Sequence, residues 1–277
     1  MEALLVLLGL LVLGFAVGVT GTMVGVGGGF LLVPVLLVLY PSESPELITS
    51  VSLAVVACSA TAGTVAYARQ KRIDWLAAAA FSLATAPGAA LGALAVGLIP
   101  RQSFDLLFGL LMAGVAAMLV LRSTPQPRVV QRRNRRWEVT RLLEDRAGDS
   151  YFYSYNVALG AAVCVAIGFL SSLLGIGGGI MLVPILIQVL RFPTHVATAT
   201  AGAVLATSAI TGTLVHVSTG SLDGGFERAL ALAAGVLIGA PVGAYLSQKV
   251  RGDTLVRLLG VAMGISAIRL LAVAAIG

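Results

Sequence analysis

Long stretches without a charged residue restrict this chain more than any other feature. The uninterrupted ones are residues 3–40, 47–68, 75–100, 106–121, 151–190, 192–222 and 229–248. A further stretch, 255–277, is broken only by Arg257 and Arg269. A bilayer core about 30 Å thick needs about 20 apolar residues per helix, and a water-soluble fold has no use for so many such segments. The sequence therefore predicts an all-α, polytopic transmembrane protein.

Composition agrees with this prediction and excludes several kinds of site. Only 11% of the residues are charged, against about a quarter in soluble domains. The apolar N-terminus has no basic region before it and is longer than the apolar part of a signal peptide, so we expect it to stay in the mature protein. Cys58 and Cys164 lie far apart and form no CxxC pair. We therefore expect no metal site and no cofactor.

The basic residues are concentrated in one place. Eight of the 18 Lys and Arg residues are arginines within residues 122–146. Loops rich in Lys and Arg face the cytoplasm in helical membrane proteins. We interpret the segment as a cytoplasmic loop of a protein in a prokaryotic-type plasma (inner) membrane, and not as a nucleic-acid-binding region.

The chain also contains an internal repeat. The pattern GxGGG-x4-P occurs at residues 25–34 and again at 175–184, and residues 49–64 match 198–213 at an offset of 149. Apolar composition alone does not readily produce this glycine pattern twice at equivalent places. The repeat predicts a first transmembrane half, 1–121, a basic cytoplasmic loop, 122–150, and a second transmembrane half, 151–277.

These features resemble those of a known family. The paired GxGGG-x4-P segments, the Ser/Thr-rich helix after each and the motif at residues 67–75 (YARQKRIDW) are similar to the sulfite exporter TauE/SafE family. The resemblance covers nearly the whole chain except the arginine loop. It implies a transporter of small sulfur-containing anions such as sulfite or organosulfonates. Related sequences often have His in the first half where this chain has Tyr67, whereas His216 occupies the matching place in the second half.

The glycine segments interrupt elements that are too long for one crossing. Residues 3–40 as a single helix would be about 57 Å long, nearly twice the hydrocarbon thickness. Glycine costs a helix about 1 kcal/mol relative to alanine, so residues 25–29 and 175–179 are the expected breaks. Arms of 11 residues would be roughly 16 Å long, about half the membrane depth. We therefore expect two re-entrant hairpins with glycine tips near the midplane.

The charges favour an inverted arrangement of the two halves. If each broken element returns to its own side, each half has three crossings and the basic groups all lie inside. These are Arg69, Lys71, Arg72, the arginine loop, Arg191, Lys249 and Arg251. If both elements cross fully, the repeats are parallel, and Arg191, Lys249 and Arg251 move outside. The positive-inside bias prefers inverted repeats.

An anion site follows from the breaks. A helix that begins after Gly29 or Gly179 directs unpaired N–H groups and its positive dipole end at the midplane. The expected backbone ligands are the amides of Gly25, Gly27, Gly28, Gly29, Gly175, Gly177, Gly178 and Gly179. The expected hydroxyl ligands are those of Thr49, Ser50, Ser52, Ser59, Thr198, Thr200, Thr207 and Ser208.

Two prolines and one histidine also have candidate functional roles, and each has a structural alternative. Pro34 and Pro184 are hinges or kinks, and His216 serves either in proton coupling or as an interfacial anchor. The glycines and serines equally suit close helix packing.

The predicted function is a secondary transporter that exports a small anion, with the bilayer and that anion as partners and a homodimer left open. The alternatives are a passive anion channel or an importer of a related anion. An enzyme is not expected, because His, Cys, Asp and Glu are nearly absent from the spans.

Cysteine labelling tests the inverted arrangement. In a variant without Cys58 and Cys164, we expect Ser221→Cys and Gln248→Cys to react with a membrane-impermeant maleimide from opposite faces of the membrane. Gln248→Cys shares its face with the arginine loop. Labelling of Gln248→Cys from the outer face would contradict the inverted model.

Overall fold

The computed structural model describes residues 2–121, 137–247, 261, 264–265 and 267–268. The described elements are the helices α1 (Glu2–Val24), α2 (Gly29–Leu39), α3 (Pro45–Arg69), α4 (Trp75–Ala95), α5 (Arg101–Leu121), α6 (Val157–Leu173), α7 (Gly179–Gln188), α8 (Thr194–Ser218) and α9 (Phe226–Leu246), the short helices η1 (Val96–Leu98) and η2 (Asp223–Gly225), and the strands β1 (Glu138–Glu144) and β2 (Ser150–Asn156).

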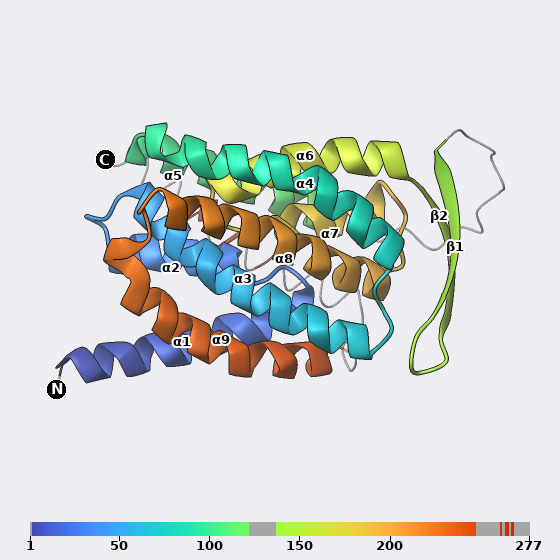
Figure 1. Ribbon diagram of the computed structural model, residues 1–277, viewed down its shortest axis with the longest axis horizontal. Coiled ribbons are helices and arrows are strands. Elements are labelled where there is room, and N and C mark those ends of the chain that lie inside the picture. The colour runs from blue at the N-terminus through green and yellow to red at the C-terminus, as the bar shows by residue number, and fades with distance from the viewer. Residues whose placement is uncertain (1, 122–136, 248–260, 262–263, 266, 269–277) are drawn as a thin grey trace.

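The helices form an elongated bundle with two distinct ends (Figure 1). The hairpin end carries β1 and β2, and the opposite end carries η1, η2 and the connection between α2 and α3. Five described helical segments are long and apolar enough to cross a membrane: Leu5–Val24, Pro45–Arg69, Trp75–Leu98, Thr194–Ser218 and Asp223–Leu246. The helical membrane class is thus confirmed. Most of the apolar stretch 255–277 and residues 122–136 of the arginine loop lie outside the described residues.

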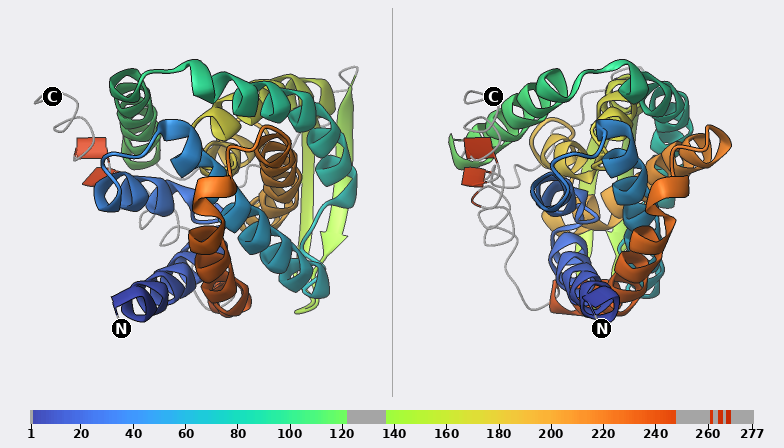
Figure 2. Two further views of the ribbon diagram at one scale, coloured as in Figure 1. Left: turned by 60° about the vertical axis from the view of Figure 1, so that its left-hand side comes forward. Right: turned by 90° about the vertical axis from the view of Figure 1, so that its left-hand side faces the viewer.

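Two pairs of helices pack through glycine, and each pair joins distant parts of the chain. α1 lies beside α9, and α4 lies beside α6 (Figure 2). A Cβ added at Gly235 or Gly239 would lie closer than 3.0 Å to the backbone carbonyls of Leu11 or Phe15. One added at Gly88 would meet Val165 in the same way. In lipid, helices associate mainly through such close van der Waals contact, so the absence of a Cβ is what permits these pairs.

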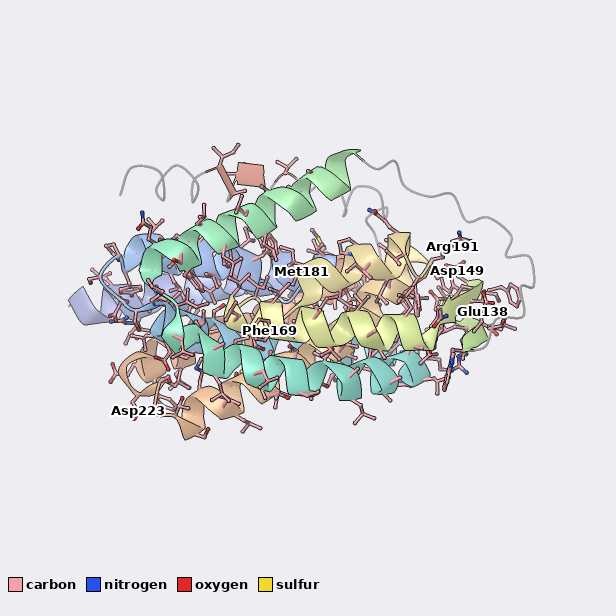
Figure 3. The ribbon with its side chains drawn as sticks, turned by 90° about the horizontal axis from the view of Figure 1, so that it is seen from above. Glu138, Asp149, Phe169, Met181, Arg191 and Asp223 are labelled. Carbon is pink, nitrogen blue, oxygen red and sulfur yellow. The ribbon has the colours of Figure 1, made fainter. Side chains whose placement is uncertain are left out.

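Each glycine segment breaks an element whose two arms lie on the same side of the bundle. α1 ends at Val24 and α2 begins at Gly29, and α2 returns toward the end at which α1 starts (Figure 1). α6 starts beside β2 and α7 returns toward the hairpin end, where Arg191 lies (Figure 3). The return helices have 11 and 10 residues, close to the expected arms. The outgoing helices are longer, with 23 and 17 residues, because no breaking residue interrupts them before the glycines.

The strands correct the all-α prediction. β1 and β2 pair antiparallel, with Arg141 opposite Tyr153 in the middle of the register. Part of the predicted basic loop and residues 151–156, taken above as the start of a broken helix, therefore form a β-hairpin. Aromatic and β-branched residues favour strands, and the sequence Tyr151-Phe152-Tyr153-Ser154-Tyr155 supplies them. Gly148, with φ of 91°, lies in the turn.

Buried polar contacts attach the hairpin to the helices. Asp74, fully buried, caps α4 through the N–H groups of Leu76 and Ala77. The Tyr153 hydroxyl donates to its other oxygen at 2.7 Å. At the turn, Arg72 pairs with Asp145 at 3.0 Å. Burial acts to raise the pKa of Asp145, but hydrogen bonds from its own turn and from Arg72 outweigh it and lower that pKa.

Gly239→Val tests the glycine packing of α1 against α9. The added side chain would meet backbone, which cannot rotate away, so we expect a loss of stability of about 1–3 kcal/mol or more. Thermal unfolding in detergent, followed by size-exclusion chromatography, measures it. Gly9→Val on α1 is the matched control, since a Cβ there meets nothing within 4 Å. Equal melting temperatures for the two variants would contradict this packing.

Candidate functional site

The two glycine segments adopt the same unusual backbone conformation. Gly25, Gly27 and Gly28 have φ of 80°, 76° and 86°. Gly175, Gly177 and Gly178 have φ of 72°, 73° and 97°. Residues with a Cβ rarely occupy this left-handed region, so glycine is needed at all six positions. The sequence thus breaks both helices in one way.

The start of each short helix lies against the glycine segment of the other half. A Cβ added at Gly29 would be 2.8 Å from the Cα of Ile176, and one at Gly179 would be 2.7 Å from the Cα of Val26. The N-termini of α2 and α7 are therefore close together inside the protein. No side chain of the described residues caps either N-terminus. The first N–H groups of a helix lack intrahelical partners, and they carry the positive end of its dipole.

α3 and α8 lie against the two breaks. Thr49 on α3 contacts Gly175, where an added Cβ would be 2.9 Å from the Thr49 Cα. Thr198 on α8 contacts Gly25 in the same way. The Ser52 hydroxyl donates to the Gly175 carbonyl at 2.6 Å, so α3 also satisfies a backbone acceptor of the second break. These three of the predicted hydroxyl residues are brought to the glycine segments.

Two further predicted hydroxyls pair with the ends of the outgoing helices. Ser59 lies 3.4 Å from the hydroxyl of Thr22 on α1, and Ser208 lies 3.2 Å from that of Ser171 on α6. All four side chains are buried. Thr22 and Ser171 were not among the predicted residues, although each lies within four residues of the glycine pattern of its half.

The other three predicted hydroxyls form hydrogen bonds away from the glycine segments. Ser50 donates to the carbonyl of Ser221 at 3.1 Å, at the opposite end. Thr200 accepts from the Asp74 N–H at 3.1 Å, and Thr207 donates to the Ser82 hydroxyl at 3.1 Å. The predicted hinges, Pro34 and Pro184, are buried inside α2 and α7.

An apolar pair that was not predicted closes the space between the breaks. Val56 on α3 and Leu205 on α8 are matching positions of the repeat, and both are buried. A Cβ at Gly27 would be 2.5 Å from Leu205 and 3.1 Å from Val56, and one at Gly177 would be 2.5 Å and 2.6 Å from them. Both side chains therefore contact both glycine segments. The 149-residue offset of the repeat places Val56 and Leu205 at matching positions and could have identified the pair. The match is hidden because one residue is valine and the other is leucine.

Tyr67 and His216, which also match in the repeat, differ in their contacts. The Tyr67 hydroxyl donates to the Thr22 carbonyl at 2.6 Å. His216 is buried, and its Nε2 has no hydrogen-bond partner among the described residues.

The arrangement suits binding of a small anion. Backbone amides and hydroxyls surround the breaks, and the sequence has no Asp, Glu, Lys or Arg in residues 3–40 or 151–190. Within the described residues, no group of three His, Cys, Asp or Glu is placed to hold a metal ion. The site can neutralise part of an anion's charge with helix dipoles and hydrogen bonds, without a full positive charge in the membrane.

Comparisons with known proteins point to one family. The family profile described as "Sulfite exporter TauE/SafE" matches residues 10–270. "Probable membrane transporter protein YunE" of Bacillus subtilis is 31% identical over 260 residues, which cover 92% of this chain and 93% of the relative. "Probable membrane transporter protein MJ0441" of Methanocaldococcus jannaschii is 26% identical over 277 residues, 95% of each chain. No solved structure matches.

Leu205→Ala tests the apolar pair between the breaks. Truncation removes buried contacts with Gly27 and Gly177, and we expect a loss of stability of about 2–5 kcal/mol. Leu214→Ala on the same helix is the matched control, because Leu214 is 63% exposed. The melting temperatures of both variants in detergent give the comparison, and an unchanged value for Leu205→Ala would count against this packing.

Proposed function

Since the chain belongs to the sulfite exporter TauE/SafE family and is a membrane transporter, we propose that it is a secondary transporter that exports a small sulfur-containing anion such as sulfite or an organosulfonate. The single observation that carries the proposal is the close approach of the uncapped N-termini of α2 and α7, each against the glycine segment of the other half.

We further propose that the halves are inverted repeats. Their contacts are reciprocal: Gly25 meets Thr198 and Gly175 meets Thr49, while Gly29 meets Ile176 and Gly179 meets Val26. The α1–α2 pair opens toward one end of the bundle and the α6–α7 pair toward the other (Figures 1 and 3). Reciprocity of this kind supports two copies of one unit that face opposite sides of the membrane.

The distribution of charge supports a cytoplasmic hairpin end. Arg69, Lys71 and Arg72 lie where the end of α3 meets the hairpin turn, Arg141 and Arg146 belong to the hairpin, and Arg191 lies at the same end (Figure 3). The opposite end has acidic residues that include Glu43, Glu46, Asp105, Asp223 and Glu227; acidic residues occur at the hairpin end too, but the positive-inside rule counts Lys and Arg. The two arginines of that end are paired, Arg101 with Asp105 at 3.1 Å and Arg228 with Glu43 at 3.0 Å. By the positive-inside rule the hairpin end faces the cytoplasm.

The anion is proposed to bind where α2 and α7 begin. Each helix N-terminus carries about half a positive charge, and in a partly buried site its interaction with an anion reaches about 2 kcal/mol. Two termini together select for negative charge, and Thr49 and Thr198 pack against the two breaks. Because the helix starts and the Val56–Leu205 pair are buried, access from either end requires a rearrangement of the two halves. This requirement favours a transporter over a passive channel.

Flux measurements in proteoliposomes test the function. We expect saturable, temperature-sensitive flux of at least one of sulfite, an organosulfonate, thiosulfate and sulfate. Flux that stays linear with anion concentration would favour the channel alternative. The absence of flux for every one of these anions would contradict the proposed substrate class, and the direction of active accumulation separates an exporter from an importer.

Gly28→Val and Gly178→Val test the proposed site. Valine is strained at φ of 86° or 97°, at a cost of about 1–3 kcal/mol, and the helix start must shift. A loss of about 1.4 kcal/mol in anion-binding free energy weakens binding about tenfold, so we expect transport to fall at least that far while membrane insertion persists. Gly114→Val on α5, where an added Cβ meets nothing within 4 Å, is the control. Normal transport by both variants would show that the glycine segments do not form the anion site.

A further inference from the structure

A second polar site lies next to the break of the second half. His216 on α8 is 1% exposed and Ser172 on α6 is fully buried. Neither the Nε2 of His216 nor the hydroxyl of Ser172 has a hydrogen-bond partner in the described part of the chain. Buried polar side chains are nearly always hydrogen-bonded to protein or to ordered water. Two unpartnered groups in one region therefore indicate a ligand that both can bind.

The position of Gly212 brings the two groups together. A Cβ added at Gly212 would lie 3.1 Å from the Ser172 hydroxyl. His216 is one helical turn after Gly212, and a helical side chain leans over the turn that precedes it. Gly212 has no side chain of its own to separate that turn from Ser172, and Leu53 also lies beside it. One nitrogen and one hydroxyl near the same turn are groups that a water molecule, or a proton carried by it, can bind.

The first half shows how the same place looks when it is closed. Gly63 is one turn before Tyr67, and a Cβ there would lie 2.8 Å from the Thr22 side chain. The Tyr67 hydroxyl reaches the Thr22 carbonyl at 2.6 Å and the Ser247 hydroxyl at 3.3 Å. The hydroxyl of Tyr67 thus has its hydrogen-bond partners within the protein. The shorter imidazole of His216 leaves its Nε2 without a hydrogen-bond partner among the described residues, and that nitrogen can take up a proton.

We propose that His216 Nε2 and the Ser172 hydroxyl form a proton-binding site that couples proton movement to anion transport. The lone pair of Nε2 accepts a proton from a hydronium ion, which leaves water and an imidazolium, and it returns the proton to water as hydronium when the anion leaves. The site rests on the proposed transport function. It is adjacent to the anion site, because the N–H of Gly175 donates to the Ser172 carbonyl at 3.3 Å. A bound anion and the imidazolium therefore stabilise each other, and one proton travels with one negative charge.

The charged surroundings favour proton entry from the opposite end. On α3, Glu46 is close enough to interact electrostatically with His216, and it accepts a hydrogen bond from Ser221. The sequences of α4, α6 and α7, which also pack against α8, contain no charged residue, and Cys164 is their one titratable group. Asp223 in η2 and the Glu43–Arg228 pair lie further toward that end. Glu46 thus places a carboxylate near His216 at that end of α3.

Anion flux with an imposed pH gradient tests the coupling. In proteoliposomes, we expect the wild type to accumulate sulfite in response to the gradient and to move protons with it, as read by a trapped pH dye. His216→Gln should lose this response and the accompanying proton movement, while anion counterflow, which needs no net proton movement, remains measurable. His195→Gln, the change at the other histidine of the chain, is the matched control and should keep the response. A His216→Gln variant that responds to the gradient like the wild type would overturn the proposal.

Nuclear magnetic resonance reads the proton site without any transport. With 13C-labelled histidine and the His195→Gln change, one imidazole signal remains. We expect it to titrate, and its midpoint to shift in Ser172→Ala. If the midpoint does not respond to Ser172→Ala, the proposed site is wrong even if transport is observed. If the signal titrates with this shift but no anion is transported, the proton site stands and the transport function fails.

Discussion

Irregular backbone in the middle of a membrane must find its partners within the protein, and this requirement organises the fold. Glycine segments that break helices expose N–H and C=O groups where no water is available. Each break meets part of this need locally, since the N–H groups of Val26 and Ile176 donate to carbonyls at the end of the preceding helix, and Ser52 of the first half donates to the Gly175 carbonyl. Each break also packs against neighbours that belong largely to the other half: the start of the opposite short helix, a threonine of α3 or α8, and the Val56–Leu205 pair. The two breaks thus pack against each other at the centre of the protein.

The same arrangement explains how a site for a charged ligand can exist without charged residues. A lysine or arginine at that depth would need a permanent partner, and a partner would compete with the anion. Helix N-termini carry partial charge that is fixed in direction and needs no counter-ion. The proposed proton site adds a charge only when one is needed, because imidazole is neutral until it accepts a proton.

The sequence predicted the parts of this fold that are local. Apolar length identified the membrane helices, and glycine identified both breaks, because each depends on residues that are neighbours in the chain. The β-hairpin was missed because its strands are short and its Tyr-rich segment was read as the start of an apolar helix. Gly235, Gly239 and Gly243 are spaced four residues apart, which predicts a helix face that packs closely against another helix. Nothing in that spacing says that the partner is α1, so the pairing required the structure. In the sequence Val56 and Leu205 resemble ordinary core residues, and only the structure shows that both contact both breaks.

The pairing of α1 with α9 has a consequence for how the protein is made. Many domains fold from the N-terminus as they leave the ribosome. Here α1 enters the membrane first, yet its packing partner is synthesised after almost all of the described chain has followed. The α4–α6 pair likewise joins the two halves, and contacts between distant segments form slowly. Until α9 arrives, the face of α1 that packs against it must be shielded by lipid or by the insertion machinery. A chain truncated between the halves would therefore leave an unfinished membrane intermediate, not half of a working transporter.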